Sequence, residues 1–316
     1  MSTATKVPQT RLMAGDELSA EDAWATLRRT GTPALVRDSF IRFRYADGFS
    51  HARALALQVC LSVIPMFIAF VGLSTTLHRQ GGGLVLEDVL ERITPGASQQ
   101  VVRTALDSSR ARGASGGLAL WLGLLVAVIA MSTAMGQIER GANRIYGVER
   151  DRPTLHKYGN AVVLVVLAGL PMAAGMAAAV AGAPIGDSLS LVYHWSATEH
   201  TAWRVLCWPL GVLLALIAAS VIFRRAPRRR QPAMSWLAFG AVVSLVLWAA
   251  FTGVLAWYVA GSSTFGATYG PLTAVMALLV WANLTSIALF LGVAMAAQLE
   301  ACRAGRTAPA LADPGV

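Results

Sequence analysis

Residues 224–259 read RRAPRRRQPAMSWLAFGAVVSLVLWAAFTGVLAWYV, a cluster of arginines followed by a long apolar stretch. Residues 234–259 contain no charged side chain, and about 20 apolar residues suffice for a helix to cross the hydrocarbon core of a bilayer. The five arginines before them belong to the kind of loop that stays on the cytoplasmic side of a membrane. This stretch therefore predicts a transmembrane helix that starts in the cytoplasm.

Five further apolar stretches have similar lengths, at residues 54–77, 116–137, 160–184, 205–223 and 272–299. The composition agrees with a membrane protein, because 55% of the residues are hydrophobic and only 14% are charged. The first stretch begins too far along the chain to be a cleavable secretory signal. We therefore predict an all-α polytopic membrane protein with six transmembrane helices.

The basic residues fall into alternate loops. Of the 26 Lys and Arg residues, 20 lie within residues 6–53, 140–157, 224–230 and 303–306. The positive-inside rule places these segments, and with them both chain ends, in the cytoplasm. Because the basic residues are spread over loops that border the membrane, anionic lipid headgroups are the expected partners and nucleic acid is not. The oligomeric state is not indicated.

The predicted spans divide the chain into three parts. Residues 1–50 form a cytoplasmic amphipathic arm, residues 51–300 form the membrane domain, and residues 301–316 form a disordered cytoplasmic tail. Residues 78–115 make the one long outer loop, in which two amphipathic patterns separated by Pro-Gly predict a short helical cap.

The cytoplasmic arm also contains an amphipathic pattern. Val36, Phe40 and Phe43 recur at the spacing of one helical face. Three arginines fall on the other faces, namely Arg37, Arg42 and Arg44. Such a basic helix either lies in the headgroup plane of the bilayer or packs against the cytoplasmic ends of the bundle.

The predicted spans hold no Asp, Glu, Lys or Arg near their centres. Proton- and ion-driven carriers usually place such a group at mid-membrane, so that mechanism is disfavoured. Gln58 and Asn283 are costly to bury and are candidates for a polar contact or a cavity lining. Pro65 frees the carbonyl of Leu61, and Ser62 can relieve part of the strain. The resulting kink either opens a space beside Gln58 or only improves packing.

Polar residues also gather at the end of the second span. Glu139 and Asn143 are four residues apart, as are Arg140 and Arg144, so two polar stripes leave the bilayer side by side, close to Tyr146. The stripes either form a solvated helix end with weak ion pairs or line the cytoplasmic mouth of a cavity.

Several motifs resemble those of the YihY/BrkB family of bacterial inner-membrane proteins. Residues 61–65, LSVIP, are similar to the family's LSxxP motif, and residues 143–150, NRIYGVER, look like its signature after the second span. Tyr269-Gly270 and Trp281 follow its C-terminal pattern. One departure is visible where members often read GAELNA, since the acidic and amide positions are Ala294 and Ala296 here.

The resemblance implies a six-helix inner-membrane protein linked to envelope integrity and virulence. It supports no ribonuclease, although the family was once named after one, because the five His and three Cys are scattered without the spacing of a metal site. We therefore expect no catalytic, cofactor-binding or metal-binding residue and no enzyme.

Two functions stay open: a transporter that translocates a lipid or an amphiphilic envelope component, and a scaffold for envelope integrity that transports nothing. The candidate cavity residues are Gln58, Ser62, Pro65, Glu139, Arg140, Asn143, Arg144, Tyr146, Tyr269, Trp281 and Asn283.

Overall fold

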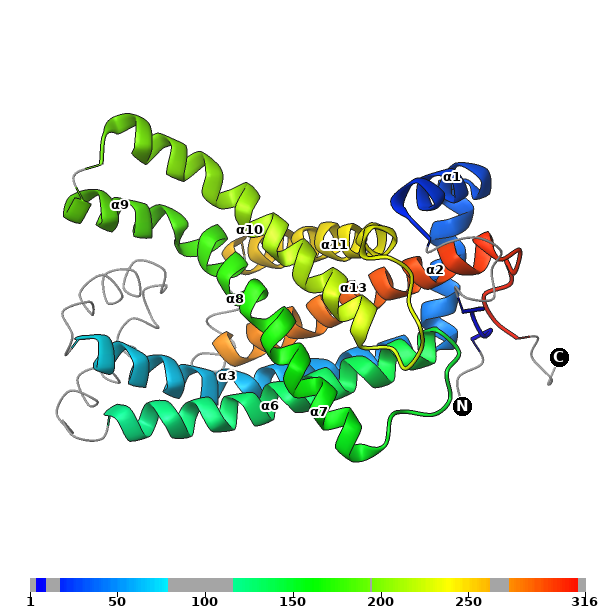
Figure 1. Ribbon diagram of the computed structural model, residues 1–316, viewed down its shortest axis with the longest axis horizontal. Helices are drawn as coiled ribbons and strands as arrows, with labels where there is room; N and C mark the ends of the chain where they lie inside the picture. The colour runs from blue at the N-terminus through cyan, green and yellow to red at the C-terminus, as the bar shows by residue number, and fades with distance from the viewer. Residues whose placement is uncertain (1–3, 10–17, 79–115, 194, 262–272, 312–316) are drawn as a thin grey trace. The chain divides into compact units, whose positions relative to one another are not determined.

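The computed structural model describes residues 4–9, 18–78, 116–193, 195–261 and 273–311 (Figure 1). The regular elements in these ranges are helices, and Ala4 and Ala310 form one isolated antiparallel β-bridge. The predicted outer cap (residues 78–115, apart from the end of the first long helix) and Tyr269 lie outside the described residues.

Six helices are long and apolar enough to cross a membrane, which confirms the predicted number of spans. These candidate spans are Gly48–Met66, Leu120–Ile145, Thr154–Ala179, Ala197–Arg225, Met234–Val259 and Val275–Arg303. Several helices continue past the predicted ends, as α6 (Gly116–Ile145) does through its polar last turns. Hydropathy finds the membrane-embedded part of a helix, whereas the backbone hydrogen bonds continue into water until a cap or breaker stops them.

The chain divides into two compact units, which we describe separately. Unit 1 comprises Met1–Cys60, Met131–Ala168 and Leu216–Val316, and unit 2 comprises Leu61–Ala130 and Gly169–Ala215. Four of the long helical segments therefore contribute to both units.

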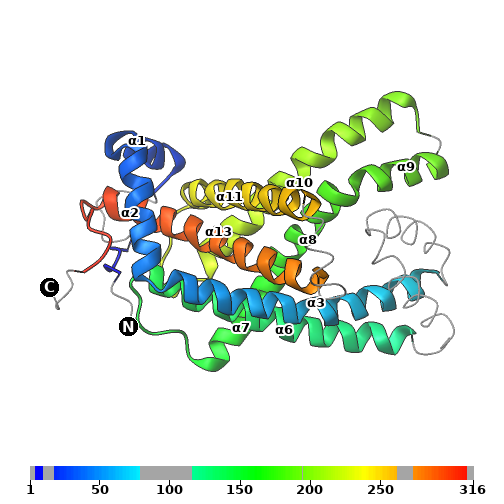
Figure 2. The same cartoon turned by 180° about the vertical axis from the view of Figure 1, so that it is seen from behind.

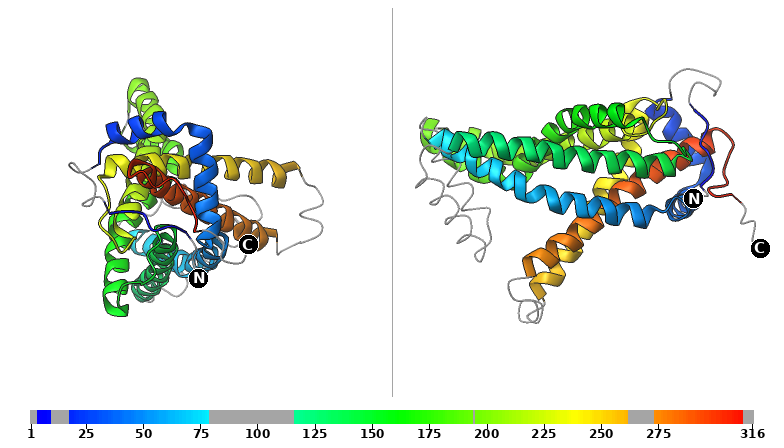
Figure 3. Two further views of the ribbon diagram at one scale, coloured as in Figure 1. Left: turned by 90° about the vertical axis from the view of Figure 1, so that its right-hand side faces the viewer. Right: turned by 90° about the horizontal axis from the view of Figure 1, so that it is seen from below.

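In unit 1, α11 (Met234–Gly261) and α13 (Thr273–Arg303) run side by side (Figures 1 and 3). Glycines permit this close approach: a Cβ added at Gly240 would lie 2.5 Å from the carbonyl oxygen of Gly292. Small residues at such crossings let two membrane helices gain van der Waals contact along their backbones.

Two short helices precede the spans in unit 1. The first, α1 (Ala20–Thr30), starts after Ser19, whose backbone N–H donates to the Asp22 carboxylate at 3.4 Å. The second, α2 (Thr32–Tyr45), crosses the end of α13 (Figure 2). Leu35 and Phe43 are fully buried there. The arm thus packs against the end of the bundle, one of the two arrangements that the sequence left open.

The buried face of α2 differs from the predicted apolar face. Val36 and Phe40 are 53% and 47% exposed, while Phe43 and the supposedly polar Arg42 are 0% exposed. Periodicity predicted the helix correctly, but it did not predict that Arg42 would be buried, because the groups that hydrogen-bond to Arg42 lie far away in the sequence.

Unit 2 is built from close helix contacts. The last part of α3 (Gly48–His78) meets the first part of α6, where a Cβ added at Gly123 would lie 2.6 Å from the Ala69 nitrogen. Helix α8 (Leu170–Met176) meets α10 (Ala197–Arg225) through Gly175 and Gly211. Beyond it, α9 (Gly182–Tyr193) accepts a 2.7 Å hydrogen bond from the Trp203 indole of α10 at the Gly182 carbonyl.

Helix irregularities lie close to the division between the units. In α3 the division follows Cys60, and Pro65 leaves the carbonyl of Leu61 without its helical donor. After α7 (Thr154–Leu164), a π-helical turn, Val165–Gly169, spans the next division. Pro171 has no backbone N–H to donate to the carbonyl of Leu167, four residues earlier and within this turn. A change of hydrogen-bond register is therefore expected there.

Candidate functional site

A polar ladder follows one side of α6 from the middle of the membrane-spanning segment toward its end in unit 1. Thr133 donates its hydroxyl hydrogen to the Gln58 side-chain oxygen at 2.8 Å. One helical turn later, the Gln137 amide nitrogen lies 3.1 Å from His51 Nδ1. All four side chains are half-buried, so the ladder is a partly accessible polar strip between α3 and α6.

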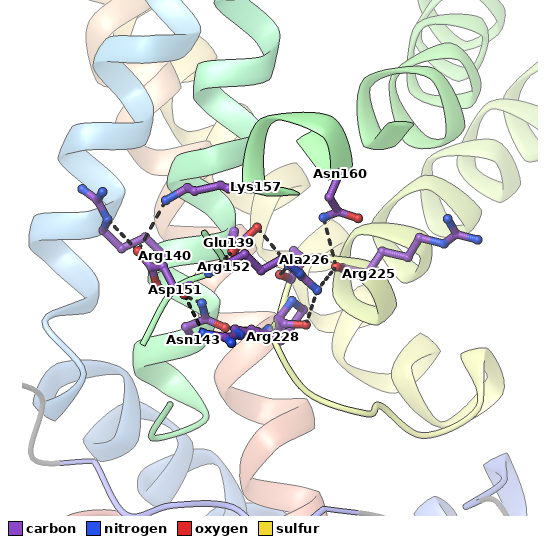
Figure 4. Close-up of polar contacts among 11 residues, drawn as sticks. Glu139, Arg140, Asn143, Asp151, Arg152, Lys157, Asn160, Arg225, Ala226 and Arg228 are labelled. Atoms are coloured by element: carbon purple, nitrogen blue, oxygen red, sulfur yellow. Dashed lines mark hydrogen bonds and ion pairs between the residues drawn. The ribbon is translucent and has the colours of Figure 1, made fainter. Parts of the chain in front are cut away.

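At the end of α6, Glu139 anchors the loop that leads to α7 (Figure 4). Its carboxylate is 2% exposed and lies 2.9 Å from Arg152 Nη1, and it also accepts the Arg152 backbone N–H at 3.2 Å. The same guanidinium donates to the carbonyls of Ala226 at 2.8 Å and Pro227 at 3.0 Å. One ion pair thereby holds the α6–α7 loop against the residues that follow α10.

Asn143 and Asp151 add a second connection (Figure 4). The Asn143 amide donates to Asp151 Oδ1 at 3.0 Å and accepts the Arg228 backbone N–H at 2.7 Å. Arg140 and Lys157 lie 3.2 and 3.4 Å from Asp151 Oδ2. Burial alone would raise the pKa of Asp151, but the hydrogen bond from Asn143 and the two cations outweigh it, and the pKa is lowered.

A second cluster surrounds Arg42 of α2, also within unit 1. Arg42 Nε donates to the Gln298 side-chain oxygen at 2.7 Å, and Nη1 donates to the carbonyls of Thr5 at 2.8 Å and Ile145 at 3.2 Å. Nη2 donates to the Thr5 hydroxyl at 2.9 Å. Burial lowers the pKa of Arg42 to about 10. Its hydrogen-bond acceptors in the described residues are all neutral.

The other cation of this cluster is Arg229. Its Nη2 lies 2.5 Å from Glu300 Oε1 and donates to the Pro8 carbonyl at 2.9 Å, while its guanidinium carbon lies 4.6 Å from the centre of the Tyr146 ring. Burial and the nearby Glu300 carboxylate raise the pKa of Tyr146 above its ordinary value. Both clusters lie near the C-terminal ends of α6 and α10, and the second also includes the C-terminal end of α13.

The structure brings only some of the predicted residues together. Glu139, Arg140 and Asn143 share the network of Figure 4. Arg144 donates instead to the carbonyls of Val148 and Glu149. Glu139 and Asn143 are 1% and 0% exposed, so they do not form the solvated helix end that was one of the two interpretations.

The remaining candidates occupy separate positions. Ser62 and Pro65 are half-buried in the part of α3 that belongs to unit 2. In unit 1, the Trp281 indole donates to Thr252 Oγ1 at 3.2 Å. Asn283 Oδ1 is buried, and no hydrogen-bond donor reaches it among the described residues.

Sequence reasoning missed the partners that complete both clusters: Arg152, Asp151, Arg229, Gln298 and Glu300. A buried arginine and an exposed one look alike in a basic loop. The one sequence signal was an acidic residue, Glu300, at the end of an otherwise apolar span. In the described ranges, no three His, Cys, Asp or Glu side chains are grouped as metal ligands.

Comparison with known proteins finds relatives over most of the chain. YfkH of Bacillus subtilis, named a ribonuclease-like protein, is 24% identical over 82% of this chain and 92% of its own length. A UPF0761 membrane protein of Alkalilimnicola ehrlichii is 28% identical over 82% of this chain, and one of Azotobacter vinelandii is 27% identical over 85%. This chain matches only 56% and 64% of the lengths of those two proteins. No solved structure matches significantly.

The family described as Virulence factor BrkB matches residues 39–314. That range contains all six candidate spans and both polar clusters, apart from the residues contributed by 4–9. The resemblance seen in the sequence is thereby confirmed. The chain is a multi-pass membrane protein with six apolar helices, and it belongs to the Virulence factor BrkB family.

Proposed function

We propose that this protein translocates a lipid or another amphiphilic component across a bacterial inner membrane. The observation that carries the proposal is the polar ladder of Gln58, Thr133, His51 and Gln137, which is half-buried within helices apolar enough to span a membrane. The four groups are paired with one another, and because they stay partly accessible their remaining hydrogen-bonding capacity can meet a polar group that passes between α3 and α6.

The chemistry of the ladder suits a headgroup in transit. Amide, hydroxyl and imidazole groups exchange hydrogen bonds without carrying a fixed charge, so they can replace water around a polar headgroup and release it again. The sequence places no Asp, Glu, Lys or Arg near the centre of a span. A proton-driven cycle is therefore not proposed, and the expected activity is equilibration between leaflets.

We also propose that the two polar clusters face the cytoplasm, because they lie among the loops that hold most of the basic residues. Anionic lipid headgroups would then surround the exposed arginines of this end. Reporter fusions should place residues 224–230 in the cytoplasm and residues 261–270 outside. The opposite signals would overturn this orientation.

Translocation is tested with purified protein in liposomes that carry a fluorescent phospholipid, by following the loss of fluorescence when an impermeant quencher is added outside. The wild type should expose lipid from the inner leaflet. A Gln58→Leu, Thr133→Val variant should act about tenfold more slowly, which corresponds to a barrier about 1.4 kcal/mol higher.

A Thr252→Val variant is the matched control, because Thr252 forms the corresponding hydrogen bond to Trp281 between α11 and α13, away from the ladder. It should keep the wild-type rate. If the wild-type protein moves no lipid, the scaffold alternative replaces the translocator. If both variants slow translocation equally, the ladder is not the path.

A further inference from the structure

Residues 4–8 run as an extended strap over the Arg42 and Arg229 cluster. The Thr5 backbone N–H donates to the Pro309 carbonyl at 3.1 Å, and the Val7 N–H donates to the Tyr146 carbonyl at 3.2 Å. The strap therefore lies between the segment after α13 and the end of α6. Residues 307–310, expected to belong to a disordered tail, are held by these contacts and by the Gln298 amide, which donates to Thr307.

The strap fits closely at the turn that ends α6. Gly147 has a positive φ of 69°, and a Cβ added there would lie 2.6 Å from the Lys6 Cα. Ala4 and Val7 are 6% and 2% exposed, so the strap is seated in the protein and does not lie loosely on its surface.

The strap gives the two arginines hydrogen-bond acceptors that carry no negative charge. Arg42 directs Nη1 and Nη2 at the two oxygens of a single residue, the carbonyl and the hydroxyl of Thr5. Arg229 donates a hydrogen bond to the Pro8 carbonyl. These acceptors are neutral, and the one charged residue of the strap, Lys6, is basic as well. A buried guanidinium is usually paired with an anion, because desolvation is otherwise poorly compensated.

Among the described residues, the cluster holds more positive than negative charge. Glu300 is the carboxylate that pairs there with Arg229, and Arg229 disfavours the charge on Arg42. Arg229 Nη1 is buried, and no acceptor contacts it among the described residues. Two forked donors aimed at paired oxygens are the arrangement by which arginines bind phosphate.

We infer that Arg42 and Arg229 form a binding site for a phosphate-type anion, and that Thr5 and Pro8 occupy this site as an internal substitute. The two oxygens of Thr5 stand where two phosphate oxygens would accept from Arg42. An arriving phosphate would displace the strap, pair with both arginines and fill the bond that Arg229 Nη1 lacks. The ligand is either a free phosphate or the phosphate of a lipid headgroup. The inference does not depend on lipid translocation.

The displacement of the strap can be measured by the labelling of a cysteine placed on it. In full-length protein with Cys60, Cys207 and Cys302 replaced by serine, Ala4→Cys puts a buried thiol on the strap. The protein is held in phosphatidylcholine nanodiscs, and the thiol is labelled with a maleimide. Inorganic phosphate, at an ionic strength matched by chloride, should raise the labelling rate severalfold if a free anion binds. Phosphatidic acid in the nanodisc should do so if the ligand is a lipid headgroup.

Two site variants separate binding from a general charge effect. Arg229→Gln should abolish the response to the effective anion, while Arg230→Gln, which removes an exposed neighbouring charge, should keep it. A response lost equally in both variants, or absent for both phosphate and phosphatidic acid in the parent, overturns the site.

A crosslink gives an independent test that does not need an arginine variant to fold. Ala4 and Ala310 pair across the antiparallel bridge, and such pairs have the Cα spacing of a disulfide. With Ala4→Cys and Ala310→Cys in the same background, the effective anion should raise the melting temperature of the reduced protein and leave the oxidised protein unchanged. Equal stabilisation of both forms would show that the strap does not occupy the site.

Discussion

The contacts that stabilise unit 1 internally differ from those that stabilise unit 2 internally. Unit 1 has charged and amide side chains buried at one end, where Arg152, Arg42 and Arg229 tie together segments far apart in the chain. In unit 2, α8 and α10 meet through backbone approaches at Gly175 and Gly211, and the ion pairs of Asp187 with His200 and Arg204 are partly exposed. Directional bonds between buried groups therefore fix the geometry at the end of unit 1, whereas close packing fixes the contact of α8 with α10. The two units should therefore respond to different substitutions.

The largest effect is expected from breaking the buried ion pair of unit 1. Glu139→Ala leaves the Arg152 guanidinium without its carboxylate, and losing one partner of a buried pair costs about 3–5 kcal/mol. Thermal unfolding in detergent, followed by helical circular dichroism, measures the loss. Arg140→Gln is the control: its side chain is 51% exposed, so its loss should cost about 1 kcal/mol or less. Similar losses in both variants would contradict the importance given to burial.

In unit 2 the corresponding change is one of volume. Gly211→Val places side-chain atoms where a Cβ already lies 2.8 Å from the Gly175 carbonyl oxygen, and such overpacking costs about 1–3 kcal/mol. Gly253→Ala is the matched helix glycine, since no atom of the described residues lies within 4 Å of its added Cβ. That control should be neutral or stabilise by up to about 1 kcal/mol. If Gly211→Val melts like the wild type, close glycine packing is not what holds α8 against α10.

The sequence predicts the two kinds of structure unequally. Hydropathy located all six spans, because a helix that crosses a bilayer must be apolar over most of its length. Periodicity predicted a helix around Val36, Phe40 and Phe43, yet it placed Arg42 on another face, although that side chain is fully buried. The signal for burial lies in Thr5 and Gln298, which contact Arg42 only after the chain has folded.

The candidate site shows the same limit. Spacing placed Glu139 with Asn143 and Arg140 with Arg144 on two neighbouring stripes, because residues four apart share a helix face. Glu139, Asn143 and Arg140 share the network, and Arg144 does not. It did not predict that Glu139 and Asn143 would be buried by Arg152 and by residues 225–228, since no periodicity links a loop to a distant helix end. Gln58 was predicted from its burial cost, whereas its partner Thr133 was not among the candidate residues.

A smaller effect is expected from pH, again in unit 1. Hydrogen bonding from Asn143 and the nearby cations lower the pKa of Asp151 below its ordinary 3.8. A carboxyl with a depressed folded pKa contributes stability above its unfolded pKa, and this contribution is lost as pH falls through the folded pKa. Asp151→Asn should therefore lower the melting temperature at pH 7, and its difference from the wild type should shrink as the pH is taken below about 4.

The exposed Glu149→Gln serves as the control for that titration, because the general effect of acid on the protein is common to both variants. Its difference from the wild type should stay small at every pH. A gap between wild type and Asp151→Asn that stays constant down to pH 3 would mean that the ionised Asp151 carboxylate is not what stabilises the α6–α7 loop.

The smallest change in stability, and the sharpest test of how the units are connected, is expected from Pro65→Ala. Pro65 lies within α3, just past the division after Cys60, and it deprives the Leu61 carbonyl of a backbone donor. Alanine restores that N–H, so the helix should stiffen while its melting temperature changes by less than the variants above. If α3 bends here during lipid translocation, the liposome assay should show a severalfold slower rate at unchanged stability. Pro209→Ala in α10 is the control, because it removes a helix proline at a similar distance from another division of unit 2, and it should keep the rate if the effect is specific to α3. A wild-type rate in Pro65→Ala would make the proline a packing feature only. A fall in rate matched by a fall in stability would indicate damage to the fold and would leave α3 without a role in movement.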